Sequence, residues 1–200
     1  MKTATRIVQP GSLGLATIAL IAGCAAQTDV ADGDQALAEQ SDALRHVPTP
    51  SDPTLNVEEG NKLAFRYDAA GVQVYVCQAD TAGKIAWALQ APDAKLYSCG
   101  GRLAGTHYAG PTWEAKDGSK VTATRVNGYQ PDPTAIPELL LKAATHEGTG
   151  QMSKVSFIQR LETSGGIAPG AGCDADHLGA TSRVDYTATY YFYEPKKSRR

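Results

Sequence analysis

The highest density of side chains that could do chemistry lies in the thirteen residues 107–119. This stretch combines a histidine, two aromatic rings, two carboxylates and the turn-forming pairs Gly-Pro and Asp-Gly. His107 is a candidate general base, Glu114 or Asp117 could orient its ring, and Arg160, further along the chain, is a candidate clamp for an anion. This set of groups would suit a hydrolase that acts on envelope polymers or esters.

The same residues also have explanations without catalysis. His107 and Tyr108 could pack beside Trp113 in a corner of a sheet, and an Asp-Gly pair at Asp117 favours a tight hairpin turn. Alternatively, Tyr108 and Trp113 could line a pocket for a carbohydrate or a peptide. We prefer packing, then a ligand pocket, then catalysis, because spacing alone does not show whether His107 and Glu114 converge across the intervening Gly-Pro.

Well-defined catalytic and cofactor motifs are missing from the sequence. The chain has no Gly-x-Ser-x-Gly nucleophile elbow, no His-Glu-x-x-His zinc motif and no Cys-x-x-Cys pair. The glycine-rich segments 100–105 and 170–172 lack the strand–turn–helix frame of a dinucleotide site. A metal site would require His107 and His177 to meet a carboxylate, which no spacing supports. We therefore predict no cofactor and no metal, and we favour a non-enzymatic role.

The chain begins with the features of an export signal. A basic start is followed by an apolar run at 12–22, too short to span a membrane, which ends in Ala-Gly directly before Cys24. This run resembles a bacterial lipobox and predicts a signal peptide at 1–23 with a lipid on Cys24. Ala25 then favours the periplasmic face of the outer membrane. The alternative is an ordinary secretory signal with a small-residue cleavage region.

Charge divides the remainder of the chain into three parts. Residues 25–60 carry eight Asp and Glu against one Arg, a net charge of −7, with few aromatic or β-branched residues. Such a composition buries too little surface to order itself, so 24–54 is predicted to be a disordered tether. A folded domain is expected at 55–195 and a basic tail at 196–200.

The charge of the folded part argues against a nucleic-acid surface. Residues 61–200 carry 16 Lys and Arg against 13 Asp and Glu, a net charge of +3, and part of this surplus belongs to the tail. A nucleic-acid site needs a concentrated basic patch. We therefore predict no nucleic-acid partner, membrane contact through the lipid on Cys24, and a monomer.

Residue patterns predict that 55–195 is mainly β. About nine short strands, roughly a dozen residues apart, favour a single antiparallel sandwich or barrel. One short helix is expected at about 135–147, where Thr134 is a possible N-cap, Gly148 fits the position after the end, and His146 lies in the last turn. The apolar stripe of this helix would consist of Ile136, Leu139, Leu140 and Ala143.

The cysteines predict one disulfide. If Cys24 carries a lipid, then Cys77, Cys99 and Cys173 remain in a compartment that permits disulfides. Residues 163–182 form a Gly- and Ala-rich loop that is too long for a compact domain unless something holds it. We predict a Cys77–Cys173 bridge, with Cys99 keeping its thiol. A Cys77–Cys99 bridge is the alternative.

Short motifs along the domain follow one another in a distinctive order. They are residues 71–77, 91–94, 107–113, 117–119, 136–137, 139–141, 158–160, 165–166, 168–169 and 186–188, with Trp87, Thr163 and Cys173. In this order they resemble the family catalogued as domain of unknown function 3455, which comprises secreted bacterial and fungal proteins. The resemblance spans about 61–193 and implies export and a single domain, but no established activity.

Two positions depart from the pattern of that family. Glu138 stands where its members usually have Trp, and Cys99 is not part of the pattern. Some members carry a malate dehydrogenase label, which the glycine-rich segments here do not support. We therefore expect an exported, membrane-tethered β domain that serves as a binding or envelope-structural module. A hydrolase with a site around His107 is the alternative.

Overall fold

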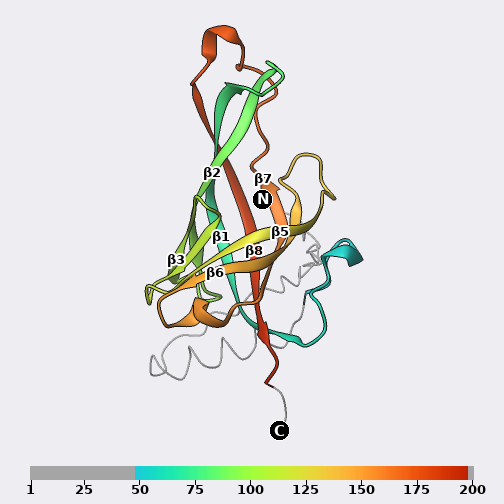
Figure 1. Ribbon diagram of the computed structural model, residues 1–200, viewed down its shortest axis with the longest axis vertical. Helices are drawn as coiled ribbons and strands as arrows, with labels where there is room; N and C mark the ends of the chain where they lie inside the picture. Colours follow the sequence, from blue (N-terminus) through green and yellow to red (C-terminus); the bar gives the residue numbers. More distant parts are fainter. Residues whose placement is uncertain (1–47, 198–200) are drawn as a thin grey trace, which may run out of the picture.

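The computed structural model describes residues 48–197, and within them eight antiparallel strands close into one barrel (Figure 1). The mainly β, antiparallel fold predicted from the sequence is confirmed. The predicted signal peptide, the lipid on Cys24 and the tether up to residue 47 lie outside the described residues. The strands are β1 (Asn61–Ala79), β2 (Ile85–Tyr97), β3 (Leu103–Tyr108), β4 (Thr112–Ala115), β5 (Lys120–Tyr129), β6 (Glu138–Glu147), β7 (Phe157–Gly165) and β8 (Thr181–Pro195).

The strands follow one another around the barrel in sequence order, and β8 pairs with β1 to close it. Because neighbouring strands run in opposite directions, the connections collect at two ends of the barrel. We call the end with connections 98–102, 116–119 and 148–156 the lower end. The upper end has connections 80–84, 109–111, 130–137 and 166–180. Short 3-10 turns occur at η1 (Pro53–Leu55), at η2 (Gln151–Lys154) on the lower end, and at η3 (Ala175–His177) on the upper end.

β1 and β2 are longer than the short strands predicted from the sequence. β1 continues without a turn through residues 68–71, where Gly71 lies tightly against β2. A Cβ on Gly71 would be 2.2 Å from the carbonyl oxygen of Asp93. β2 continues through Pro92, since only its residues from Ala94 onward pair with β3. A proline is tolerated on an unpaired strand edge.

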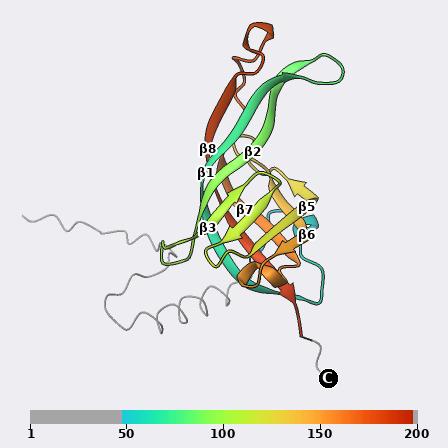
Figure 2. The same ribbon diagram turned by 60° about the vertical axis from the view of Figure 1, so that its left-hand side comes forward.

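β1, β2 and β8 project beyond the other strands and form an arm at the upper end (residues 74–91 and 181–183; Figure 2). A Cys77–Cys173 disulfide ties loop 166–180 to this arm. The Trp87 indole nitrogen also donates to the carbonyl of Ala171 at 2.9 Å. The predicted Cys77–Cys173 bridge is therefore confirmed, and it holds the long loop as expected.

Cys99 is disulfide-bonded as well. The prediction that this residue keeps its thiol is therefore wrong. The prediction assumed three available thiols, and an odd number must leave one over.

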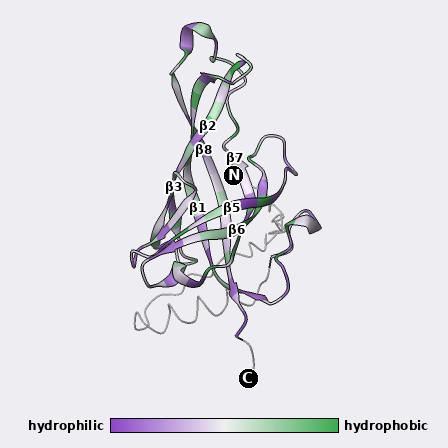
Figure 3. Cartoon of the chain, viewed as in Figure 1, coloured by the Kyte–Doolittle hydropathy of each residue, from purple (hydrophilic) through white to green (hydrophobic). Residues whose placement is uncertain are grey.

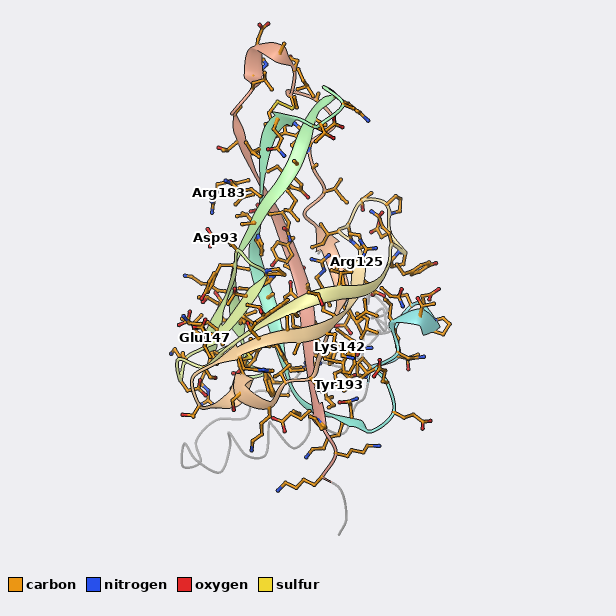
Figure 4. The ribbon with its side chains drawn as sticks, in the orientation of Figure 1. Asp93, Arg125, Lys142, Glu147, Arg183 and Tyr193 are labelled. Atoms are coloured by element: carbon orange, nitrogen blue, oxygen red, sulfur yellow. A yellow bond between two sulfur atoms is a disulfide. The ribbon has the colours of Figure 1, made fainter. Side chains whose placement is uncertain are left out.

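An ion pair crosses the outer face of β1 near the base of the arm. Arg183 of β8 and Asp93 of β2, both labelled in Figure 4, form this pair, in which Nη2 lies 2.6 Å from Oδ2. Both side chains are largely exposed, so this pair adds little to stability.

The helix predicted at about 135–147 is wrong, because residues 138–147 form strand β6. β6 pairs with β5 along one edge and with β7 along the other. Leu141 points into the barrel core, and Leu140 is buried in a second cluster on the outer face. A strand covered on both faces has consecutive apolar residues, which periodicity cannot distinguish from a helix. His146, placed by the sequence at a helix end, instead hydrogen bonds to the carbonyl of Val155 at 2.7 Å.

The hydrophobic core has two parts. The larger part fills the barrel, and Figure 3 shows that hydrophobic residues also extend into the arm. The smaller part lies outside the barrel, where β8 contributes a second pair of rings, Tyr191 and Tyr193. The smaller cluster consists of Leu55, Leu63, Leu140, Phe157, Leu161, Tyr191 and Tyr193.

The outer cluster is covered by the segment that precedes β1. Leu55 is fully buried, and its carbonyl accepts a hydrogen bond from the side-chain amide of Gln159 at 2.7 Å. The side chain of Asn127 donates to the carbonyl of Thr54 at 3.0 Å. The buried carboxylate of Glu138 accepts from the backbone of Ser51 at 3.3 Å. The last residues of the predicted tether therefore pack on the barrel. None of the helical turns in 48–197 is long and apolar enough to span a membrane.

Candidate ligand-binding site

The upper half of the barrel interior holds a cavity of about 590 Å³. This is within the range of roughly 300–1,000 Å³ that is typical of small-molecule sites. All eight strands contribute to its wall, so the site exists only when the barrel is closed. The wall consists of Gln73, Leu89, Pro92, His107, Pro111, Trp113, Ala123, Thr124, Arg125, Pro137, Leu139, Leu141, Arg160 and Tyr190.

Three aromatic rings form one side of the cavity. His107 on β3 lies opposite Trp113 on β4 in the strand register, and their rings stack with centroids 4.2 Å apart. Tyr190 of β8 meets both rings edge-on, at 5.1 Å from His107 and 5.4 Å from Trp113. All three side chains are at most 3 % exposed. This packing gives the cavity a rigid aromatic surface.

The ring of His107 is neutral. Burial lowers its pKa to about 3, and the nearby charge of Arg160 acts in the same direction. The Nδ1 atom lies 2.9 Å from the carbonyl oxygen of Thr112, which can only accept, so Nδ1 carries the proton and Nε2 is the acceptor. A base with so low a pKa is far from the value that favours proton transfer near neutral pH. His107 is therefore a poor general base.

Three residues of the cavity wall carry a buried polar atom that lacks a hydrogen-bond partner in the described part of the chain. The atoms are Gln73 Oε1, Trp113 Nε1 and Tyr190 OH. A buried polar atom left unpaired costs about 1–3 kcal/mol, and such atoms are rare in native proteins. Three of them around one cavity are the groups that a bound molecule would satisfy.

The charged groups of the wall are both cationic. Arg160 of β7 donates from Nε and Nη2 to the carbonyl of Pro137, at 3.0 and 2.8 Å. Arg125 on β5 is exposed and can be followed in Figure 4. Neither arginine forms an ion pair within residues 48–197, and the wall contains no carboxylate. The site therefore has a net positive charge.

Glu114 and Tyr108 lie on the outer face of the barrel and not in the cavity. Glu114 follows Trp113 directly, and successive residues of a strand point to opposite faces. Its carboxylate accepts from the Tyr108 hydroxyl at 2.7 Å and lies 3.9 Å from the Lys120 ammonium. The structure therefore does not bring His107 and Glu114 together.

Asp117 lies at the lower end, where it has a structural role. One carboxylate oxygen accepts from the backbone nitrogen and the hydroxyl of Ser119, at 2.9 and 2.6 Å. The other accepts from the backbone nitrogen of Gln151 at 2.8 Å. These hydrogen bonds lower the pKa of Asp117. The buried Ser119 hydroxyl also accepts from the backbone of Met152 at 3.0 Å. This network fastens the β4–β5 hairpin to η2.

His177 is remote from His107 as well. It lies in η3, on the upper loop, and its Nδ1 is 2.6 Å from the exposed carboxylate of Asp174. Among residues 48–197, no group of three His, Cys, Asp or Glu side chains is arranged to hold a metal ion.

The family described as "Protein of unknown function (DUF3455)" matches residues 58–194. The chain belongs to this family. The match runs from the residues before β1 to the penultimate residue of β8, so it includes every strand that lines the cavity. No curated protein and no solved structure matches the chain. The resemblance predicted from the motifs is confirmed, and any function of this DUF3455 domain has to be argued from the chemistry of its site.

Of the six candidates named from the sequence, the DUF3455 barrel brings His107, Trp113 and Arg160 into one cavity. Tyr108, Glu114 and Asp117 lie elsewhere. Sequence reasoning missed Gln73, Tyr190 and Arg125. The sequence places Gln73 on the same face of β1 as Tyr75 and Cys77, but only the structure shows that this face is buried and that the valines between them are partly exposed. A polar residue on a buried face is a candidate for ligand recognition.

Proposed function

We propose that this DUF3455 protein is a binding module that holds a small, partly apolar molecule in the upper half of its barrel. The observation that carries the proposal is the set of unpaired polar atoms, Gln73 Oε1, Trp113 Nε1 and Tyr190 OH, around one cavity of about 590 Å³. A purely structural domain gains nothing from burying such atoms without partners, since each lowers its stability.

The cavity wall has the composition of a ligand site. Apolar side chains such as Leu139 and Leu141 provide surface that stabilises a bound apolar group at about 25 cal/mol per Å² removed from water. The few polar groups then determine the orientation of the molecule. A hydrolase built on His107 has less support, because this ring is neutral with a pKa of about 3 and Glu114 lies on the opposite face of the sheet.

The test uses a neutral fluorescent probe, N-phenyl-1-naphthylamine, and a substitution that fills the cavity. Ala123 is small, buried and part of the wall, so Ala123→Phe should occupy the space of the probe. The matched control is Ala144→Phe, at an exposed position on β6. We expect wild type and the control to bind the probe alike, and Ala123→Phe to bind at least about tenfold more weakly, from the loss of roughly 1.4 kcal/mol or more of contact. Unchanged binding by a folded Ala123→Phe variant would refute the proposal.

We also propose that the protein is exported and that its barrel lies on the periplasmic side of the bacterial outer membrane. The apolar run before Cys24 supports export, and the Cys77–Cys173 disulfide is typical of an oxidising compartment. Mass spectrometry of the mature protein should find a chain that has lost the apolar run at 12–22. A mature chain that still carries this run would contradict export.

A further inference from the structure

We propose that the ligand is a small anion with a planar, apolar body, of which an aryl carboxylate is the simplest example. Its acid group would lie against Arg160 and Arg125, and its ring would lie along the aromatic surface formed by His107 and Trp113. This inference rests on the proposed function, since it assumes that the cavity binds a small molecule.

The side chains of the cavity wall carry an unbalanced positive charge. Its wall carries Arg125 and Arg160 and no acidic side chain, and His107 adds no charge of either sign because its ring is neutral. Within residues 48–197 neither arginine has an ion-pair partner. Charges interact more strongly in a partly enclosed space than in water. An anion would therefore be attracted to this site and a cation repelled.

The guanidinium of Arg160 is held in one orientation beside the cavity. Two of its N–H groups donate to the single carbonyl of Pro137, which fixes the plane of the guanidinium beside the cavity. An arginine has five N–H donors in a rigid fork, so three remain for a ligand. The charge also acts across the interior, because it contributes to the lowered pKa of His107 and opposes the effect of burial on the pKa of Tyr75 and Tyr186.

Arg125 provides a second, more exposed cation beside the cavity. A Cβ placed on Gly128 would lie 2.6 Å from Arg125 Nη2 and 2.8 Å from Leu139 Cδ2. Glycine at this position therefore makes room for the guanidinium next to a residue of the cavity wall. An exposed arginine without an ion pair can move to meet a ligand at little cost.

The inner wall of the cavity offers both hydrogen-bond donors and hydrogen-bond acceptors to a ligand. Trp113 Nε1 only donates, Gln73 Oε1 only accepts, and Tyr190 OH can do either. A ligand that satisfies all three needs a group that both donates and accepts, such as a hydroxyl, at a distance from its acid group. A hydroxy-substituted aryl carboxylate meets every requirement. A neutral sugar lacks the negative charge that would pair with the two arginines.

The test compares two probes that share the same rings and differ in one sulfonate. These are 8-anilino-1-naphthalenesulfonate, which is anionic, and neutral N-phenyl-1-naphthylamine. We expect wild type to bind the anionic probe more tightly, by roughly tenfold or more, the effect typical of a hydrogen bond to a charged group. Higher salt should weaken binding of the anionic probe only. Competition by 1-naphthoate, but not by 1-naphthylmethanol, would extend the result to carboxylates, and 6-hydroxy-2-naphthoate, whose hydroxyl is on the other ring from its acid group, should compete best.

Substitution of each arginine then locates the anion. Arg125→Gln should weaken binding of the anionic probe by roughly tenfold and leave the neutral probe nearly unchanged, whereas Arg125→Lys should retain most of the preference. Arg160→Gln should act in the same direction. If the hydrogen bond of Arg160 to Pro137 proves necessary for folding, then Arg125→Gln, at an exposed side chain, decides the matter.

The outcomes separate this inference from the proposed function. Equal binding of the two probes in wild type, with both lost in Ala123→Phe, leaves the binding function intact and overturns the anion preference. Binding of the anionic probe that Ala123→Phe does not affect places the anion outside the cavity and also overturns it. If neither probe binds to the folded protein, the proposed function itself fails.

Discussion

The two ends of the barrel interior differ in whether their buried polar groups have hydrogen-bond partners. At the lower end, the buried Ser119 hydroxyl bonds to both Asp117 and the backbone of Met152, and Asp117 also holds the backbone of Gln151. At the upper end, the polar atoms of Gln73, Trp113 and Tyr190 have no partner within the described part of the chain. The same ring of eight strands therefore has one end that is saturated with hydrogen bonds and one that is not.

This difference supports the proposal that the lower end stabilises the fold and that the upper end binds a ligand. Hydrogen bonds that are complete within the protein stabilise its fold, whereas incomplete ones cost stability unless another molecule completes them. The charges follow the same division. The carboxylate of Asp117 is used by the backbone, but the arginines of the cavity face no acidic partner. Residues 107–119 run through both ends, which is why one dense stretch of sequence supplies both a cavity wall and a structural turn.

The largest expected effect concerns the covalent tie of the upper end. Replacing both Cys77 and Cys173 by serine removes a bridge that spans 96 residues. We expect a loss of about 2–5 kcal/mol in the free energy of unfolding, because the unfolded chain gains freedom. Urea denaturation measures the loss. Hydrogen exchange should show the arm and loop 166–180 loosened, with the amide of Gln151 at the lower end still protected. Equal loosening at both ends would show that the disulfide does not stabilise the upper end in particular.

A smaller loss is expected from Ser119→Ala at the lower end. This change removes the hydroxyl that bonds to Asp117 and leaves the buried backbone nitrogen of Met152 without its acceptor. The expected cost is about 2–3 kcal/mol in the free energy of unfolding. Chemical denaturation gives the value, and probe binding by the folded fraction should stay as in wild type. A variant as stable as wild type would show that the lower network has no architectural role.

A comparable effect should follow from acidification, through His107 at the upper end. Its pKa is about 3 in the folded state against 6.5 for the free side chain, so the unfolded chain takes up the proton first. The contribution of the neutral His107 to the free energy of unfolding is fully present above pH 6.5, and it is lost as the pH falls towards 3. At pH 5 the loss is about 2 kcal/mol. We expect the stability of His107→Gln, measured by urea denaturation, to fall less than that of wild type between pH 7 and pH 5. Parallel losses in the two proteins would contradict the neutral, buried ring.

The smallest expected effect is that of replacing Gln73 at the upper end. Gln73→Leu removes a buried oxygen that has no partner, and the leucine is of similar size. The free energy of unfolding should change by less than about 1 kcal/mol. The expected direction is an increase, because no hydrogen bond is lost and an unpaired buried oxygen is removed. Thermal unfolding measures this change beside that of Ser119→Ala. A cost as large as that of the Ser119 substitution would mean that the upper end is as much part of the architecture as the lower.

Much of the fold could be predicted from the sequence, because alternation along strands and turn chemistry are local. The antiparallel β class, the Cys77–Cys173 bridge and the family follow from such patterns. Strand β6 could not be recognised from the sequence. The run Leu139, Leu140, Leu141 is extended because it pairs with β5 and β7 and because the segment before β1 covers its outer face. The continuation of β1 through Gly71 likewise depends on how closely β2 approaches, a contact between residues distant in sequence.

The candidate site divides in the same way. The sequence by itself determined which side chains were available, and its spacing placed His107 and Trp113 near each other. Only the closed barrel decided that Arg160 and Tyr190, contributed by β7 and β8, join them and that Glu114 does not. The reason is that a strand sends neighbouring residues to opposite faces, while its register with partners far along the chain determines which of those faces is enclosed.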